Sequence, residues 1–204
     1  MDILPADGKG IERALSTLRD GGIIAHATET CYGFACDVTS LGAVANLFAL
    51  KNRPFTSPVS ALFASIDEAK KYVEWNDEAE RLARKYLPGP LTLILPQQAD
   101  APQRLYATPL QPTTSNLPVT IGLRISSLSL AQQLVSAFGK PLTTTSANLH
   151  GQPNPYSVQD IVAQFKNQVI QPDLILDSGT IPQTPPSTVI DLTEQGKVKR
   201  KGQV

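Results

Sequence analysis

The amino-acid sequence predicts an α/β protein that forms a single domain over residues 1–204. Its length of 204 residues suits one compact domain, and its 41% of hydrophobic residues can supply a sizeable core. Helix and strand signals alternate along the chain, which is typical of the α/β class. Some predicted strands follow one another without a helix between them, so we expect a twisted, mostly mixed β-sheet with flanking helices.

Six segments carry helix signals. In the first, apolar residues recur at positions 11, 14, 15 and 18, and Gly21 is a natural stop. Ser65 with Glu68, and Ser157 with Asp160, have the spacing of helix N-terminal caps. The predicted helices lie within residues 11–22, 41–51, 65–73, 76–87, 127–141 and 157–165.

Six further segments have strand character. The first is apolar and turns polar at residues 28–30, as expected of a strand that leaves the core. The predicted strands lie within residues 22–30, 91–95, 119–125, 142–148, 173–177 and 187–192. Residues 96–118 are rich in Pro, Gln and Thr, and we expect a long mobile loop beside the site there. Residues 197–204 form a basic end.

Composition excludes several classes of protein. The 18 Lys and Arg residues balance 18 Asp and Glu residues, so only a local patch could bind nucleic acid. Cys31 and Cys36 have no nearby Cys or His pair, since the only histidines are His26 and His150. We expect half-buried thiols in a reducing cytosol, with a disulfide or metal site as the alternative. No signal peptide or membrane span of ~18 apolar residues is present, so a cytoplasmic protein without membrane contact is expected.

Several familiar catalytic motifs are missing from the sequence. It contains no G-x-x-x-x-G-K-[ST], no strand-linked G-x-G-x-x-G and no G-x-S-x-G. Two histidines give no credible Ser-His-Asp set, and no pair of carboxylates is an obvious candidate. The protein must therefore use another kind of site.

The segment Lys-Asn-Arg-Pro at 51–54 is the first candidate. Pro54 disfavours a helical conformation for Arg53, so the segment is expected to leave the helix and extend. In an extended segment Lys51 and Arg53 point the same way, and a point charge beside a planar guanidinium suits polyphosphate. The alternative is a pair of solvated charges that stabilise the helix dipole.

Polar residues at two strand ends are further candidates. Arg124 would hold a carboxylate or phosphate, supplied either by a ligand or by a structural Asp. Ser146 and Asn148 would project to one side of an extended segment and bind phosphate, ribose or base. The alternative for this pair is an Asx or Ser turn that caps the next element.

Two runs of hydroxyl side chains accompany these candidates. Residues 28–30, Thr-Glu-Thr, would form a cavity wall or an ordinary loop. Along the second run, Thr143 and Thr145 are expected on one face, and Thr144 on the other with Ser146 and Asn148.

These segments, in this order, resemble the YrdC/Sua5 family, the threonylcarbamoyl-AMP synthases. The motifs that carry the resemblance are ATETCYG (27–33), KNRP (51–54), PGPLT (88–92), LRIS (123–126), TTSANLHG (144–151), STVID (187–191) and RKG (200–202). Each motif is weak alone, but together they span nearly the whole chain. The resemblance implies a YrdC-like domain with helices around a concave cavity, and the length is similar to that of the short bacterial form.

The resemblance also implies an activity. Family members are nucleotidyltransferases that condense L-threonine, bicarbonate and ATP to threonylcarbamoyl-AMP and pyrophosphate. The adenylate serves the t6A modification of tRNA, so contact with t6A-synthesis proteins and with tRNA is implied. Mg²⁺ would accompany the ATP. Because no covalent enzyme intermediate is needed, catalysis would rest on positioning and charge stabilisation.

The family motifs imply roles for individual residues. Lys51 and Arg53 would be the catalytic residues and bind the triphosphate. The implied ATP-binding residues are Lys51, Arg53, Ser57, Ser146, Asn148, Asn154 and Arg200. The implied threonine-binding residues are Thr30, Arg124, Thr144 and Ser187, with Arg124 paired to the carboxylate.

Three positions depart from the family pattern. Ala27 stands where a proline is usual, Leu62 where some longer members have a histidine, and Asn154 near a frequent arginine. The alternative function is a non-catalytic RNA-binding module of the same fold, with KVKRK (197–201) as its basic patch. A diverged relative that binds a nucleotide for another carbamoylation is a third hypothesis.

Overall fold

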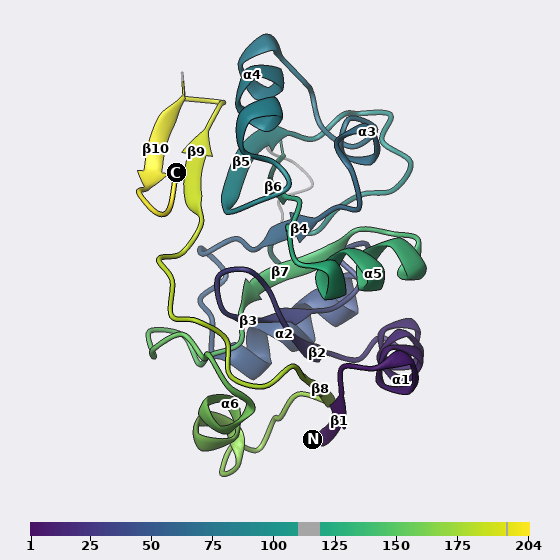
Figure 1. Cartoon of the computed structure of the whole chain (residues 1–204). Helices are drawn as coiled ribbons and strands as arrows, with labels where there is room; N and C mark the ends of the chain where they lie inside the picture. Colours follow the sequence, from purple (N-terminus) through teal and green to yellow (C-terminus); the bar gives the residue numbers. More distant parts are fainter. Residues whose placement is uncertain (110–118, 195) are drawn as a thin grey trace.

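A computed structural model describes residues 1–109, 119–194 and 196–204 (Figure 1). The described residues form a ten-stranded sheet in the order β1-β8-β2-β3-β7-β4-β6-β5-β9-β10. The strands are β1 (Asp2–Pro5), β2 (Ile24–Ala27), β3 (Tyr32–Ala35), β4 (Ser60–Leu62), β5 (Leu91–Pro96), β6 (Thr120–Arg124), β7 (Leu142–Ser146), β8 (Leu174–Asp177), β9 (Thr188–Asp191) and β10 (Lys197–Arg200). Neighbouring strands are parallel in some pairs and antiparallel in others, so the predicted mixed sheet is confirmed.

Helices cover both faces of the sheet (Figure 1). They are α1 (Gly8–Arg19), α2 (Leu41–Lys51), α3 (Ile66–Ala69), α4 (Asp77–Tyr86), α5 (Ser129–Phe138) and α6 (Val158–Phe165). Leu18 of α1 and Leu134 of α5 belong to one buried cluster, whereas Leu47 of α2 belongs to another. In the second cluster, the rings of Phe34 and Phe165 meet edge to face at 5.4 Å. Each such buried side chain contributes roughly 1.5–3 kcal/mol.

The helix ends follow the signals in the sequence. Gly21 and Gly139 have φ of 81° and 78°, a left-handed conformation that ends α1 and α5. Ser157 and Asp160 form a complete capping box at the start of α6. The helix predicted at 65–73 is much shorter than expected, because α3 stops at Ala69.

Four strands lack a clear signal in the sequence. β1, β3 and β4 have only three or four residues each, too few for a period to show. β10 arises from the basic end, and all four of its residues are exposed because it pairs with β9 alone at the end of the sheet.

The segment after β5 is better anchored than the predicted mobile loop. Residues 97–109 contain no helix or strand, but Leu105 and Ala107 are buried. The Tyr106 N–H donates to the Val38 carbonyl at 2.9 Å, and the Val59 N–H donates to the Ala107 carbonyl at 2.8 Å. The mobile-loop prediction is therefore wrong for 97–109, and its remainder, 110–118, lies outside the described residues. No described helix has the length and apolar character needed to cross a membrane.

His26 on β2 is a buried histidine that ties stability to pH. It is 1% exposed, and its Nδ1 lies 2.9 Å from the Ala27 carbonyl oxygen. Burial is the main reason why its pKa falls from 6.5 to about 4. Between these pH values the unfolded chain binds a proton that the folded protein excludes. The free energy of unfolding should therefore fall by about 3 kcal/mol as the pH drops through this window.

Replacing His26 with Asn should remove this part of the acid sensitivity. Denaturant unfolding at pH 7 and pH 4.5 measures it, because the difference between the two proteins cancels the contribution of the carboxylates. The wild type should lose more stability than the variant. Equal losses would contradict the prediction.

Candidate functional site

One face of the sheet forms the floor of a cavity of about 490 Å³. Across β7, β4, β6, β5 and β9 the strand register places Thr144, Ser60, Gly122, Ile94 and Asp191 in one row, and all five line the cavity. Side chains alternate along a strand, so Ala61, Leu93 and Leu123, which are adjacent to members of this row, pack the core instead. The site is thus formed by the polar face of strands whose opposite face packs in the hydrophobic core.

Arg124 lies at the end of β6 and lines this cavity. Its Nη2 donates to Glu29 Oε1 and to Thr30 Oγ1, both at 2.8 Å. The Ser126 hydroxyl donates to the other oxygen of Glu29. The structural carboxylate beside Arg124 is therefore a glutamate rather than the aspartate considered from the sequence.

The ion pair leaves Arg124 incompletely satisfied. Burial raises the pKa of Glu29, but the Arg124 charge and hydrogen bonds from Ser126 and Arg124 outweigh burial and lower the pKa overall. Arg124 itself is only 8% exposed, and its buried Nε has no partner among the described residues. A buried donor without a partner costs about 1–3 kcal/mol. This guanidinium is therefore not fully occupied by the protein.

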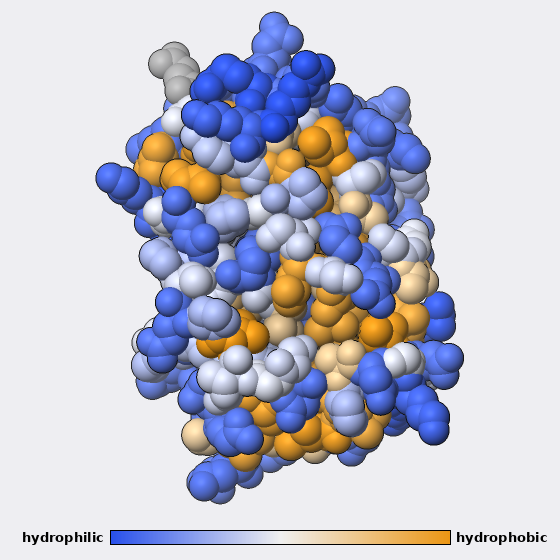
Figure 2. Space-filling view, in the orientation of Figure 1, coloured by the Kyte–Doolittle hydropathy of each residue, from blue (hydrophilic) through white to orange (hydrophobic). Residues whose placement is uncertain are grey.

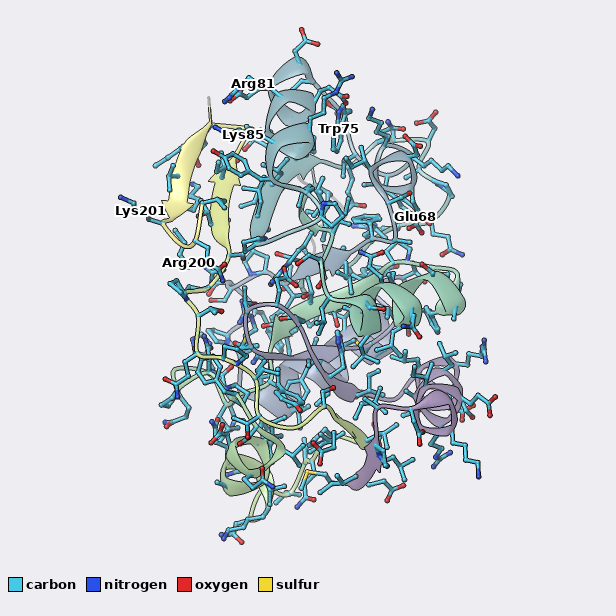
Figure 3. The ribbon with its side chains drawn as sticks, in the orientation of Figure 1. Glu68, Trp75, Arg81, Lys85, Arg200 and Lys201 are labelled. Carbon is cyan, nitrogen blue, oxygen red and sulfur yellow. The ribbon has the colours of Figure 1, made fainter. Side chains whose placement is uncertain are left out.

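A second guanidinium enters from the last strand. Arg200 of β10 donates from Nε to the Ser187 carbonyl at 3.0 Å and from Nη2 to Ser187 Oγ at 2.9 Å. Ser187 Oγ also lies 3.1 Å from Thr92 Oγ1. Burial and the charge of Arg124 lower the pKa of Arg200, which means that the two cations share one electrostatic environment. In Figure 3, Arg200 lies on the inner side of Lys201, which projects outward.

Gly202 fixes the tail that carries Arg200. A Cβ at this position would lie 2.0 Å from the Pro186 carbonyl oxygen and 2.6 Å from the Ser187 carbonyl carbon. The Gly202 N–H donates to Thr188 Oγ1 at 3.0 Å. Only glycine allows this close approach of two backbones, which explains the glycine of the RKG motif.

Replacing Gly202 with Ala should push the tail away from β9 and withdraw Arg200 from Ser187. If the cavity binds ATP, as the sequence resemblance implies, its affinity for the nucleotide should fall about tenfold, the equivalent of one charge-assisted hydrogen bond. The melting temperature should change little, because the tail packs at the end of the sheet. Calorimetric titration with ATP measures the affinity, with Lys201→Ala as the matched control. Equal affinity of Gly202→Ala and the wild type would contradict this account.

Lys51 does not occupy the place predicted for it. It is the last residue of α2, and Asn52 adopts a left-handed conformation, so the expected extended segment is absent. Lys51 is 1% exposed and is not among the residues that line the cavity. Its Nζ donates to the Ser146 carbonyl, to the Asn148 carbonyl at 2.7 Å and to Asn148 Oδ1 at 3.1 Å. Burial, with a smaller contribution from the charge of Arg53, lowers its pKa to about 7.

Arg53, in contrast, lines the cavity as expected. Its Nε donates to the Ser57 carbonyl at 2.6 Å and its Nη2 to the Pro58 carbonyl at 2.9 Å. Burial lowers the pKa of this guanidinium. Ser57 therefore supports Arg53 through its backbone and does not itself line the cavity.

The hydroxyl run on β7 divides almost as predicted. Thr144 and Ser146 line the cavity, whereas the Thr143 hydroxyl accepts a hydrogen bond from the Cys36 N–H at 2.9 Å. Thr145 also lines the cavity, contrary to the prediction. Asn148 does not line it, because its amide bonds to the protein instead: Oδ1 accepts from Ser146 Oγ and from Lys51 Nζ, and Nδ2 donates to the Gln152 carbonyl.

The cavity collects most of the residues predicted for the site. Those that line it are Thr30, Arg53, Arg124, Thr144, Ser146, Asn154, Ser187 and Arg200, and those that do not are Lys51, Ser57 and Asn148. Six polar lining residues were missed: Ser60, Thr92, Thr120, Thr145, Asp191 and Lys199. Polar or small residues at alternate positions of apolar strands, such as Thr120 and Gly122, were the signal that would have found some of them.

The remaining predictions concern single positions. Leu62 belongs to the core cluster beneath α1 and α5, so it faces away from the cavity. Both cysteines are buried free thiols, and Cys31 lines the cavity. Among the described residues, no three His, Cys, Asp or Glu side chains gather as a metal site would require.

A second, mostly apolar cavity lies between the start of α1 and the start of α5. Its apolar lining is formed by Pro5, Ala6, Ala27, Leu128, Leu130 and Ile181, and no cation is among the described residues that line it. Figure 2 shows a broad hydrophobic area below and to the right of its centre, over this part of the molecule. Of these two cavities, only the first carries cationic groups.

The sheet face brings three arginines together among hydroxyl groups, so the chain is an α/β protein with a cationic cavity that suits a small anionic ligand. The chain belongs to the Sua5/YciO/YrdC family, whose model, described as "Telomere recombination", matches residues 16–202. The family expected from the sequence motifs is therefore confirmed.

Curated relatives carry the name threonylcarbamoyl-AMP synthase, an enzyme of the nucleotidyltransferase type. A relative from Vibrio cholerae is 32% identical over 186 residues, which cover 90% of this chain and 93% of the relative. A relative from Pyrococcus abyssi is 32% identical over 185 residues, and they cover 90% of this chain and 51% of the relative. The chain thus spans about half the length of the archaeal relative.

Solved structures share the fold. Sua5 from Pyrococcus abyssi in complex with L-threonine superposes with a TM-score of 0.82 at 30% identity, over 98% of this chain and 56% of that chain. YciO from Escherichia coli superposes with a TM-score of 0.81 at 28% identity, over 98% of this chain and 94% of that chain. The mixed α/β architecture is therefore that of the family.

Proposed function

We propose that the protein is an L-threonylcarbamoyladenylate synthase, which condenses L-threonine, bicarbonate and ATP to threonylcarbamoyl-AMP and pyrophosphate for tRNA t6A modification. The observation that carries the proposal is the shared cavity, in which Arg124 with Thr30 faces the same space as Arg53 and Arg200. A carboxylate and a triphosphate, the two anionic groups of the substrates, each need such cations. The structure of a relative with bound L-threonine supports the proposal that the cavity binds this amino acid.

The reaction needs no nucleophilic side chain. The amine of threonine attacks the carbon of bicarbonate, and loss of water gives a carbamate. A carbamate oxygen then attacks the α-phosphorus, and the bond to the β-phosphate oxygen breaks to release pyrophosphate. The protein would contribute by holding the two reactants together and by stabilising negative charge.

Threonine would lie at the Arg124 end of the cavity. Arg124 lines the cavity, and its guanidinium would pair with the carboxylate. Thr30, Thr144 and Ser187 line the cavity with it, and their hydroxyls would bind the polar groups of the amino acid.

ATP would occupy the remainder of the cavity. Arg53 and Arg200 would bind its phosphates, and Ser146 and Asn154 its nucleoside. Lys199 also lines the cavity, although its Nζ pairs with Glu194 at 2.7 Å and Asp191 at 3.4 Å. Ser57 and Asn148 would act through Arg53 and Ser146, to which they are hydrogen-bonded.

Mg²⁺ would enter with the nucleotide. Asp191 is the only carboxylate among the described residues that line the cavity, and a thiol, Cys31, is not a ligand that Mg²⁺ favours. Asp191 already accepts from Thr193 and pairs with Lys199, so this donor set fits an ion held mainly by phosphates and water. The ion would supply charge neutralisation of the phosphates.

The decisive experiment identifies the nucleotide product. The protein is incubated with ATP, L-threonine, bicarbonate and Mg²⁺, and the nucleotides are resolved by mass. Threonylcarbamoyl-AMP should form together with pyrophosphate and only when all three substrates are present. Folded protein that releases no pyrophosphate under these conditions would refute the proposal, and a product that forms without threonine would favour another carbamoylation.

The RNA-binding module finds less support. Two lysines of its expected basic patch are ion-paired, since Lys197 and Lys199 both contact Glu194. Salt-sensitive tRNA binding without nucleotide binding would favour it nonetheless. Contact with tRNA and with t6A-synthesis proteins, and a cytoplasmic location, belong to the present proposal.

A further inference from the structure

The side chain of Lys51 is hydrogen-bonded to one short segment, which contains Ser146 and Asn148. The three acceptors of its Nζ are the carbonyls of Ser146 and Asn148 and the side-chain oxygen of Asn148. The His150 N–H closes the contact from the backbone, because it donates to the Lys51 carbonyl at 2.8 Å. The end of α2 is thus joined to residues 146–150 by four hydrogen bonds.

These contacts use the full bonding capacity of the ammonium group. A lysine ammonium has three donors and no acceptor, and three protein oxygens already surround it. A phosphate could reach Nζ only if one of these bonds broke. The side chain is also 1% exposed, whereas Arg53, two residues later, lines the cavity.

The segment that Lys51 holds is part of the cavity wall. Ser146 lines the cavity, and its hydroxyl donates to Asn148 Oδ1 at 2.6 Å. That same oxygen accepts from Lys51. The lysine therefore fixes the oxygen that orients the Ser146 hydroxyl, without facing the cavity itself.

We infer that Lys51 is a positioning residue, which holds residues 146–148 in place so that Ser146 can bind the nucleoside, and that it does not contact the triphosphate. This inference rests on the proposed function, because it assigns Lys51 a part in nucleotide binding. Arg53 and Arg200 then remain as the cations for the phosphates.

The affinities for ATP and AMP separate a positioning role from a phosphate contact. Calorimetric titration compares the wild type with Lys51→Met and with Arg53→Met as the matched control. Lys51→Met should lower the affinities for ATP and AMP by the same factor, about tenfold. A displaced cavity wall would weaken binding of the nucleoside, which both ligands contain. Arg53→Met should lower the affinity for ATP more than the affinity for AMP.

Two outcomes would overturn the inference. A selective loss of ATP affinity in Lys51→Met would make Lys51 a phosphate ligand, and unchanged affinity for both nucleotides would remove it from the site. These results would leave the proposed function intact. A wild-type protein that bound neither nucleotide would overturn the proposed function together with the inference.

Asn148→Ala provides a second test in case Lys51→Met does not fold. It removes the oxygen shared by Lys51 and Ser146 but leaves the lysine in place. The affinities for ATP and AMP should again fall together, and the double variant should lose little more than either single variant, because the two residues act as one unit. Additive losses, or a loss confined to ATP, would count against the inference.

Discussion

Replacing Arg124 with Met is expected to lower the affinity for L-threonine and the rate of adenylate formation by about 100-fold, the effect of losing a charged pair of hydrogen bonds. Arg124 lines the cavity that also holds Thr30, Thr144 and Ser187. Threonine binding by calorimetry and product formation measure the two effects separately. The conservative variant Arg124→Lys should restore the charge but little of the affinity, because an ammonium cannot present a planar pair of donors.

The same change should also destabilise the fold. Glu29 would keep its buried negative charge without the guanidinium, and an unpaired buried charge costs about 3–5 kcal/mol. The double variant Glu29→Gln with Arg124→Met removes that charge and should recover much of the stability but none of the threonine affinity. Denaturant unfolding tests this comparison. If the double variant bound threonine as the wild type does, Arg124 would not be the carboxylate ligand.

Replacing Gly122 with Val should fill the floor of the cavity and lower the affinity for the substrates about tenfold. The reason is steric, because a side chain forced into occupied space typically costs about 1–3 kcal/mol. Gly122 lies at the centre of the row of cavity-lining residues that crosses the sheet, between Ser60 and Ile94. A Cβ there would lie 2.5 Å from Ser60 Oγ and 3.2 Å from Thr92 Cγ2. Both neighbours line the cavity, so the added side chain and the displaced ones would fill space that the substrates need.

Gly122→Ala is the graded control for this prediction. Its single methyl group should displace mainly the end of the Ser60 side chain and produce a smaller loss than Val. Affinities for ATP and L-threonine, measured together with the melting temperature, distinguish a filled cavity from a weakened sheet. Wild-type affinity in Gly122→Val would show that the substrates bind elsewhere.

Much of the helical part of the fold could be predicted, because the residues that begin or end several helices are recognisable in the sequence. Gly21, Gly139 and the pair Ser157 and Asp160 mark helix boundaries through local chemistry, which needs no knowledge of tertiary contacts. Short strands such as β4 carry no such mark. They form because neighbouring strands offer hydrogen bonds, and that information lies far away in the sequence.

The candidate site was predictable where strand alternation decides direction and not where a helix does. Thr144 and Ser146 face the cavity, as their spacing of two residues on β7 predicts, although Thr145 between them lines it too. Lys51 was expected in an extended segment because Pro54 follows, but the helix continues through Lys51 and turns only at Asn52. The proline acts on the residue directly before it, so it could not determine the direction of Lys51.

The alternation of β5 and β6 has a consequence for the tolerance of this protein to random mutation. Leu93 and Leu123 pack the core, whereas Thr92, Thr120 and Gly122 line the cavity. A library screened for cellular abundance should therefore be depleted at the core-facing positions, and one screened for the proposed activity at both sets. Subtracting the two profiles would leave a signal at every second residue, which would outline the substrate site without any bound ligand.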